Sequence, residues 1–314
     1  MLEKNQTVVT EFLLLGFGNL HELRILLFVL CLVIHINAVT GNVLVIVLVL
    51  VNQSLHFPMY FFLSQLSLSE ILFTTNIVPS MLWLILVGCG RVSVNRCISQ
   101  LFLLGVPTIN QCLLLAAMSF DRHVAICKPL HYTIIMTFKL QVQMSLSCWL
   151  VGFTFSFVIY ILLDRLEFCG PNIINHFYCD IAPVVELSCS DTSVVMLVTS
   201  LLSFPVVISP FIFILVTYIS ILSTILKIPS NTGRQKAFST CSSHLTVACL
   251  YYGTLSFLYI FPPSNNSVNV NKGLSLLYTL LTPLFNPLIY SLRNHDIRKA
   301  INRHIKQWTK YPIR

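Results

Sequence analysis

The chain has 314 residues, of which 56% are hydrophobic and only 10% are charged. A soluble domain of this size would carry about a quarter charged residues, so the composition excludes an ordinary soluble protein and indicates one integral membrane domain. The net charge of +8 does not indicate a nucleic-acid partner, because no basic face with aromatic residues between the charges is present.

The beginning of the chain does not match a signal peptide. The segment MLEKNQTVVTEFLLLGF has no long apolar core followed by a small-residue cleavage site. We therefore expect the first spanning helix to act as its own insertion signal. The expected division is an outer N-terminal segment (residues 1–22), a membrane domain (23–292) and an inner tail (293–314).

Seven stretches are long and apolar enough to cross a bilayer, which requires roughly 20 helical residues. The expected fold is therefore all-α, a seven-transmembrane helix bundle with its N-terminus outside. A short basic stretch, residues 294–305, is expected to form an eighth, amphipathic helix along the membrane surface. The seven spans are Leu23–Val51, Pro58–Val87, Cys97–Ile126, Leu140–Leu163, Val194–Lys227, Ala237–Phe261 and Gly273–Leu292.

The distribution of basic residues predicts the orientation. If the N-terminus is outside, most of the 19 Lys and Arg residues fall in the inner loops and tail, accompanied there by two acids, Asp121 and Asp296. Basic residues accumulate on the cytoplasmic side of membrane proteins, so this orientation is favoured. Asn5 begins an N-glycosylation acceptor, Asn-Gln-Thr, on the expected outer side.

Four of the 11 cysteines fall in the expected outer regions: Cys97, Cys169, Cys179 and Cys189. The last three lie in one long second outer loop. An oxidising compartment favours disulfides, and four cysteines allow three pairings, among which the spacing does not choose.

Polar residues within the spans are costly and therefore indicate functional positions. Asn42, Glu70, Gln111 and Asn286 lie on four different spans. A carboxylate with amides on neighbouring helices could hold a cation with a small water cluster. The alternative is a protonated Glu70 that is hydrogen-bonded only for packing.

The third span connects two levels of the bundle. Leu104, Thr108 and Gln111 follow the three-and-four spacing of one helix face. Arg122 lies 18 residues after Leu104, which is five turns and about 27 Å, so both side chains point the same way. This face links an outer, apolar level to an arginine at the inner end.

Several segments resemble one receptor family over nearly the whole chain, in the expected order. They are LHFPMYFFLSQLSLSE, MSFDRHVAICKPLHY, KAFSTCSSHL, YYGT and PLFNPLIYSLRN. The chain resembles a vertebrate odorant receptor of the tetrapod-type group, within the rhodopsin-like G-protein-coupled receptors. Glu70 departs from the pattern, since the family usually has Asp there.

The resemblance implies a plasma-membrane receptor that signals through a stimulatory olfactory G protein. It implies the disulfides Cys97–Cys179 and Cys169–Cys189, and it places Glu70 near a sodium-type site. It also implies an activation switch formed by Asp121, Arg122, Tyr218, Asn286, Pro287 and Tyr290. The implied ligand-binding residues lie between helices three, five, six and seven: Leu104, Gly105, Thr108, Ile109, Leu202, Val206, Tyr252, Leu255, Ser256, Tyr259, Leu276 and Thr279.

Leu104 stands where amine receptors of this superfamily carry a carboxylate, so no charge partner awaits an ammonium group. A neutral pocket with a few hydroxyls suits a small lipophilic ligand held by burial and one hydrogen bond. At roughly 25 cal/mol per Å² of buried surface, a volatile-sized molecule gains only modest, micromolar affinity.

The sequence also bears on three other functions. A channel or transporter would show inverted repeats or several charges within the spans, and the spans contain essentially one acid. An enzyme would show a catalytic or phosphate-binding motif, and none is present. The same fold could instead sense a non-odorant metabolite outside the nose, which the sequence leaves open.

Overall fold

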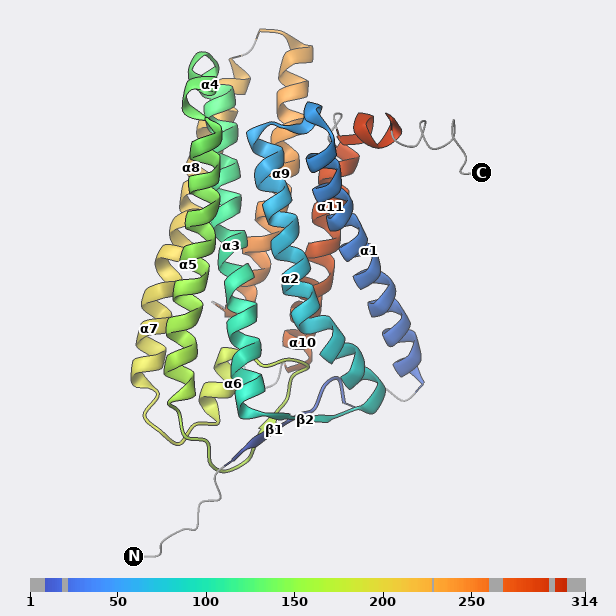
Figure 1. Ribbon diagram of the computed structural model, residues 1–314, viewed down its shortest axis with the longest axis vertical. Coiled ribbons are helices and arrows are strands. Elements are labelled where there is room, and N and C mark those ends of the chain that lie inside the picture. The colour runs from blue at the N-terminus through green and yellow to red at the C-terminus, as the bar shows by residue number, and fades with distance from the viewer. Residues whose placement is uncertain (1–8, 19–21, 228, 260–267, 294–296, 304–314) are drawn as a thin grey trace, which may run out of the picture.

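The computed structural model describes residues 9–18, 22–227, 229–259, 268–293 and 297–303. These residues form a bundle of long, roughly parallel helices, with a small β-sheet across one end (Figure 1). We call this end the disulfide end, because both disulfides described below lie there. We call the opposite end the Arg122 end.

Seven rods make up the bundle in the described part of the chain. Four are single helices in the first half, α1 (Leu23–Val51), α2 (Pro58–Val87), α3 (Val94–Cys127) and α5 (Phe138–Asp164). The fifth rod joins α7 (Ser193–Ser203), the π-helical turn η3 (Phe204–Ile208) and α8 (Ser209–Leu226). The sixth is α9 (Asn231–Tyr259), and the seventh joins α10 (Val268–Leu276), the π-helical turn η4 (Leu277–Leu281) and α11 (Thr282–Arg293).

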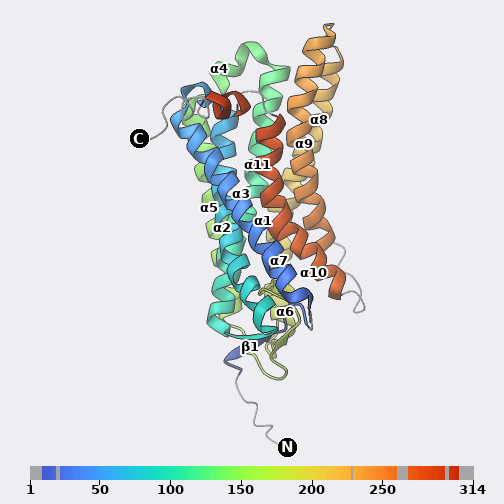
Figure 2. The same cartoon turned by 90° about the vertical axis from the view of Figure 1, so that its right-hand side faces the viewer.

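Short helices lie at both ends of the bundle (Figure 2). They are η1 (Gln53–Leu55), η2 (Pro129–His131) and α4 (Tyr132–Ile135) at the Arg122 end, and α6 (Ile181–Glu186) at the disulfide end. Residues 297–303 are also helical, with Ile297 and Ala300 buried and Arg298 and Lys299 exposed. This segment is amphipathic, as expected of the eighth helix.

Five of the rods among the described residues are long and apolar enough to cross a membrane by length and composition. They are α1, α2, α3, α5 and the α7–η3–α8 rod, and large apolar side chains such as Ile25 and Leu50 point outward from them, each 70% exposed. Outward apolar side chains suit contact with lipid. α9 has a polar first half, and α10 and α11 are individually shorter than a span.

Prolines account for the two π-helical turns. A proline cannot donate to the carbonyl four residues earlier, and its ring presses against that carbonyl. For Pro210 that carbonyl belongs to Val206 in η3, and for Pro283 it belongs to Thr279 in η4. The wider turns therefore occur at two of the expected ligand-binding positions.

α3 is the central helix and packs against α2, α5, α8 and α9. Its approach to α5 depends on Gly152, because a Cβ there would lie only 2.8 Å from the Val106 carbonyl oxygen. α1 approaches α11 at Gly41, where a Cβ would lie 3.1 Å from Pro287 Cγ. Small residues allow such close contacts between membrane helices.

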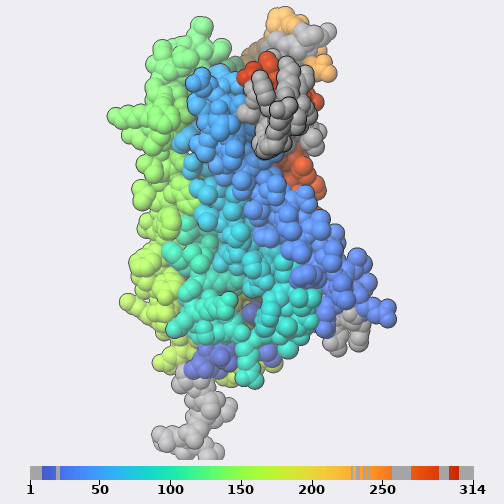
Figure 3. Space-filling view, turned by 45° about the vertical axis from the view of Figure 1, so that its right-hand side comes forward, coloured from blue at the N-terminus to red at the C-terminus, as the bar shows by residue number. Residues whose placement is uncertain are grey.

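A three-stranded sheet covers the disulfide end of the described chain, and the sequence did not predict it. β1 (Glu11–Leu14) is the central strand, antiparallel to β2 (Gly90–Ser93) and parallel to β3 (Ile173–Ile174). Phe12 is fully buried and packs edge-to-face on Phe168, with ring centroids 5.1 Å apart. In the space-filling view the β1 segment, in dark blue, lies across this end (Figure 3).

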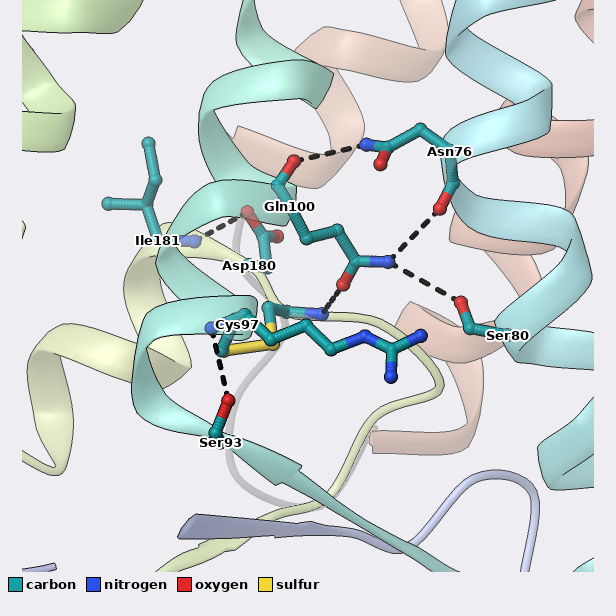
Figure 4. Close-up of a disulfide and its surroundings, with 9 residues drawn as sticks. Asn76, Ser80, Ser93, Cys97, Gln100, Asp180 and Ile181 are labelled. Carbon is teal, nitrogen blue, oxygen red and sulfur yellow. Dashed lines mark hydrogen bonds between the residues drawn. A yellow bond between two sulfur atoms is a disulfide. The ribbon is translucent and has the colours of Figure 1, made fainter. Parts of the chain in front are cut away.

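Two disulfides join the described cysteines at this end. Cys97, at the start of α3, is bonded to Cys179, with Cα atoms 5.6 Å apart, and Cys169 is bonded to Cys189, at 5.9 Å. These are the pairs that the resemblance implied. Gln100 supports the first pair, since its side-chain oxygen accepts the N–H of Cys179 at 3.0 Å (Figure 4). The long second loop is thereby attached to α3.

Replacing Cys97 or Cys179 with Ser should greatly reduce the yield of folded protein, because it detaches the second loop from α3. Cys89→Ser is the matched control, since Cys89 lies nearby in the sequence, is exposed and is not in a disulfide. Mass spectrometry of non-reduced peptides should find Cys97 and Cys179 linked. Free thiols at both positions in folded protein would contradict the pairing.

Candidate functional site

An acidic and basic pair marks the Arg122 end of α3. Asp121 is fully buried, and Arg122 donates to Asp121 Oδ2 from Nε at 2.9 Å and also from Nη2. The hydroxyl of Tyr132, in α4, donates to Asp121 Oδ1 at 2.8 Å. Burial and the nearby Asp121 carboxylate raise the pKa of Tyr132, so its hydroxyl remains a donor. Both oxygens of Asp121 are therefore occupied.

A second contact at this end joins α8 to α9. The Tyr218 hydroxyl lies 2.5 Å from His244 Nδ1, and the two rings are stacked with centroids 5.6 Å apart. His244 is fully buried. His244 was not among the expected site residues, yet the structure makes it the direct partner of Tyr218, an expected switch residue. The side chain of Tyr290, another expected switch residue, lies outside the described residues.

The carboxyl group of Glu70 lies fully buried in the middle of the bundle. Asn286, from α11, donates its Nδ2 to Glu70 Oε1. Asn42, from α1, donates to the carbonyl of Pro283 at 3.1 Å. Three expected members of the intramembrane site therefore come from α1, α2 and α11, and two of them are directly bonded.

Several oxygens in this region have no hydrogen-bond partner among the described residues. They are Glu70 Oε2, Asn42 Oδ1, Asn286 Oδ1 and Asn110 Oδ1. Buried polar atoms are normally paired with protein or water. A set of carboxylate and amide oxygens is also the donor set that hard cations prefer. The residues thus fit either ordered water or a small cation.

Asn110 was missed by the sequence reasoning, which named its neighbour Gln111. Asn110 is fully buried and donates to Ser69 Oγ, beside Glu70 on α2, at 2.5 Å. Gln111 is also buried, but its Nε2 has no partner in the described structure. Adjacent helical residues point about 100° apart, so only one of the two can face α2.

Three neighbouring tyrosines donate hydrogen bonds to α3, two at Thr108 and one at Cys112. The hydroxyl of Tyr251 donates to the Thr108 carbonyl at 2.7 Å, and that of Tyr278 donates to Thr108 Oγ1 at 3.4 Å. Tyr252 donates to the Cys112 carbonyl at 2.9 Å. We call Tyr251, Tyr252 and Tyr278 the tyrosine cluster. It ties α3 to α9 and η4 at the level of the expected ligand.

Aromatic contacts extend the cluster to two further rods. Phe211, in α8, lies against Tyr252 with ring centroids 5.1 Å apart. Phe73, in α2, packs edge-to-face on Tyr278 at 4.9 Å. Such contacts stabilise by about 1 kcal/mol beyond burial. Side chains from five rods thus meet at the tyrosine cluster.

The expected ligand-binding residues do not all lie together. Five are buried in the bundle, and these are Leu104, Val206, Tyr252, Leu255 and Thr279. Ile109, Leu202, Ser256 and Leu276 are partly buried. Gly105 faces α5 instead, because a Cβ there would lie 2.6 Å from Ser156 Oγ. The side chain of Tyr259 lies outside the described residues, as does Asn5.

Comparisons with known proteins identify the family. A family model described as olfactory receptor matches residues 30–308. The chain is 44% identical to human olfactory receptor 10R2 over 96% of the chain and 90% of that protein. It is 43% identical to human olfactory receptor 10A3, over all of the chain and 99% of that protein. It is 45% identical to mouse olfactory receptor 5P68, over 96% of each.

The chain belongs to the olfactory receptor family. It is therefore a seven-helix, G-protein-coupled odorant receptor of the plasma membrane, as the sequence predicted, and not an enzyme. Its partners are a small ligand and a G protein.

The structure adds four residues to the receptor's sites that the sequence reasoning did not name as functional: Asn110, His244, Tyr251 and Tyr278. Tyr251 could have been found, since it precedes Tyr252 in the YYGT segment. Tyr278 could not, because no spacing rule relates a tyrosine of the seventh rod to Thr108 on the third.

Tyr251→Phe removes one hydroxyl and leaves the ring, so it tests the contact with Thr108. We expect it to lower the stability of the purified receptor by about 1 kcal/mol, because the bond to a buried carbonyl is lost. Tyr160→Phe is the control, since the Tyr160 hydroxyl makes no hydrogen bond in the described structure. Equal thermal unfolding of both variants would show that the Tyr251 bond contributes nothing.

Proposed function

We propose that the receptor binds a small lipophilic molecule between α3, η3, α9 and η4 and activates a G protein of the stimulatory olfactory type at the Arg122 end. The disulfide end faces outward and the Arg122 end faces the cytoplasm. Disulfides at one end and most basic residues at the other support this orientation. Membrane lipid surrounds the outward apolar side chains.

The observation that carries the proposal is the continuity of α3. Thr108 accepts hydrogen bonds from tyrosine hydroxyls of α9 and η4. Asp121 accepts hydrogen bonds from Arg122 at the other end of the same helix. A ligand that moves α9 relative to Thr108 therefore acts on a rod whose inner end contacts α8 through Tyr218. On this account the switch comprises Asp121, Arg122, Tyr218, Asn286, Pro287 and Tyr290.

At the inner end, Asp121 keeps Arg122 away from the G protein in the resting state. The inner end must open to admit the C-terminal helix of the G-protein α subunit. Arg122 then supplies hydrogen bonds to that helix. Because Tyr132 occupies the second oxygen of Asp121, α4 also holds the resting arrangement.

The buried oxygens near Glu70 form the intramembrane site of the proposal. Asn42, Glu70 and Asn286 would hold a sodium ion, and Asn110 supplies a further oxygen from α3. A bound ion would satisfy oxygens that otherwise remain unpaired. Because these residues belong to α1, α2, α3 and α11, an ion there would favour the resting arrangement of these rods.

The ligand-binding level contains apolar side chains and hydroxyls, including those of Thr108 and the tyrosine cluster. Leu104 is buried there and offers no charge to an ammonium group. Transferring a cation to such surroundings without a partner is costly.

Protonated amines should therefore be poor agonists, whereas neutral alcohols, aldehydes, ketones or esters of similar size should be better. Cyclic AMP in cells that express the receptor would be measured with an amine and its uncharged counterparts. A permanent cation as the most potent agonist, with potency unaffected by neutralising acids of the outer loop, would overturn the proposed pocket.

Arg122→Ala should abolish agonist-driven cyclic AMP while leaving surface expression nearly normal. Asp121→Asn should raise signalling without ligand, because it weakens the restraint on Arg122. Arg234→Ala is the control for charge loss, since Arg234 is an exposed residue of α9. If the Asp121–Arg122 pair only stabilises helix ends, Arg122→Ala would lower expression and signal together. An expressed Arg122→Ala receptor that signals fully would rule out the switch.

A further inference from the structure

A buried lysine lies at the disulfide end of the seventh rod. Lys272, in α10, is only 7% exposed, and its ammonium group donates to Asn175 Oδ1, in the second loop, at 2.7 Å. The described residues contain two ion pairs, Arg91–Glu11 and Asp121–Arg122. Lys272 therefore has no carboxylate partner in this part of the chain. A buried cation normally has an opposite charge beside it.

The acid nearest in sequence to Asn175 is Asp180, which caps α6 and forms no ion pair with Lys272 in the described structure. Asp180 accepts the N–H of Ile181 at 2.8 Å. An ammonium group has three hydrogens to donate. One is directed to Asn175, so the positive charge retains the capacity to bind a further, negatively charged acceptor.

His176 adds a second polar group with unused capacity. It is 8% exposed, its Nε2 lies 3.3 Å from Ser275 Oγ in α10, and its Nδ1 has no hydrogen-bond partner in the described structure. Burial, and the positive charge of Lys272, lower the pKa of His176 to about 3. The ring is therefore neutral at physiological pH, and with its proton on Nδ1 it can accept from Ser275 and donate to an anion.

These groups lie directly above the expected ligand level. Lys272, Ser275, Leu276 and Thr279 are spaced three, four and seven residues apart, so they share one helix face. Thr279 also donates its hydroxyl to the Ser275 carbonyl at 2.8 Å. Lys272 and Thr279 are about 10 Å apart along the rod, which is the length of a medium aliphatic chain.

We propose that Lys272, with His176, receives the carboxylate of an aliphatic acid whose apolar chain extends toward Leu276 and the tyrosine cluster. This inference rests on the proposed ligand site and names one class of ligand for it, carboxylic acids in their ionised form. The ammonium group and the carboxylate form a charge-assisted hydrogen bond, which is stronger than a neutral one. The same cation repels protonated amines.

The competing explanation is that Lys272 only fastens the second loop to α10 through Asn175. Two substitutions separate these roles. Lys272→Arg keeps the charge, whereas Lys272→Met removes it and keeps an apolar stem of similar length. Asn175→Asp preserves the contact with Lys272 but supplies a carboxylate of the receptor's own, which should compete with that of the ligand.

The test uses purified full-length receptor with butanoate, hexanoate, octanoate and decanoate, each compared with its methyl ester. Thermal unfolding reports binding, because a ligand that binds only the folded state stabilises it. At least one acid should stabilise the unmodified receptor. Lys272→Met and Asn175→Asp should each weaken that acid at least about tenfold, the loss expected for a hydrogen bond to a charged group, while its ester changes little. The Lys272→Arg variant should still bind the acid, because it keeps the positive charge.

The inference is overturned if no acid stabilises the unmodified receptor, or if Lys272→Met shifts acid and ester equally. An equal loss of affinity for the acid and its ester would indicate that Lys272 only attaches the second loop to α10. Cyclic AMP distinguishes this failure from failure of the proposed function. If neutral agonists raise cyclic AMP but no acid binds, only the proposed carboxylate site is wrong. If acids bind but no ligand raises cyclic AMP, only the proposed G-protein coupling is wrong.

Discussion

Inside a membrane, polar groups need partners within the protein, because hydrocarbon offers none. In this receptor α3 supplies many of these partners. Asn110 bonds to α2, Thr108 receives hydroxyls from α9 and η4, and Ser119 lies 2.6 Å from Thr217 Oγ1 in α8. Asp121 completes the series with Tyr132. Since each bond joins α3 to a different element, a shift of α3 relative to one of them alters contacts at several levels of the bundle.

The disulfide end is stabilised differently, because its loops lack the regular backbone hydrogen bonds of a helix. β1 pairs with β2 in the first outer loop and with β3 in the second, and its buried Phe12 anchors the sheet against Phe168. The second loop is further fixed to α3 by Cys97–Cys179 and to α10 by Lys272. The second loop is thus attached to α3 and α10, and these rods also contribute to the ligand-binding level.

The sequence predicted what depends on length and periodicity, and it missed what depends on pairing between distant segments. The bounds of α1 and α2 agree with the expected spans, since long apolar runs leave few alternatives. β1 was missed because four residues, Glu11–Leu14, carry no signal for their partners. Gly105 was expected at the ligand, but α3 is packed on both sides, and its face toward α5 is also apolar. The choice of Gln111 over Asn110 reflects the same difficulty, because helix rotation is set by neighbours rather than by local sequence.

On this account, contacts along α3 keep the Arg122 end closed until a ligand moves α9. Spin labels at Ile134 in α4 and Phe238 in α9, which are both outward-facing, would measure that opening directly. Electron-spin distance measurements on the receptor in lipid should give a short distance without ligand. An agonist with the G protein should lengthen it by several ångströms, and Asp121→Asn should populate the longer distance without agonist. An agonist that activates the G protein while the distance distribution stays unchanged would contradict the account.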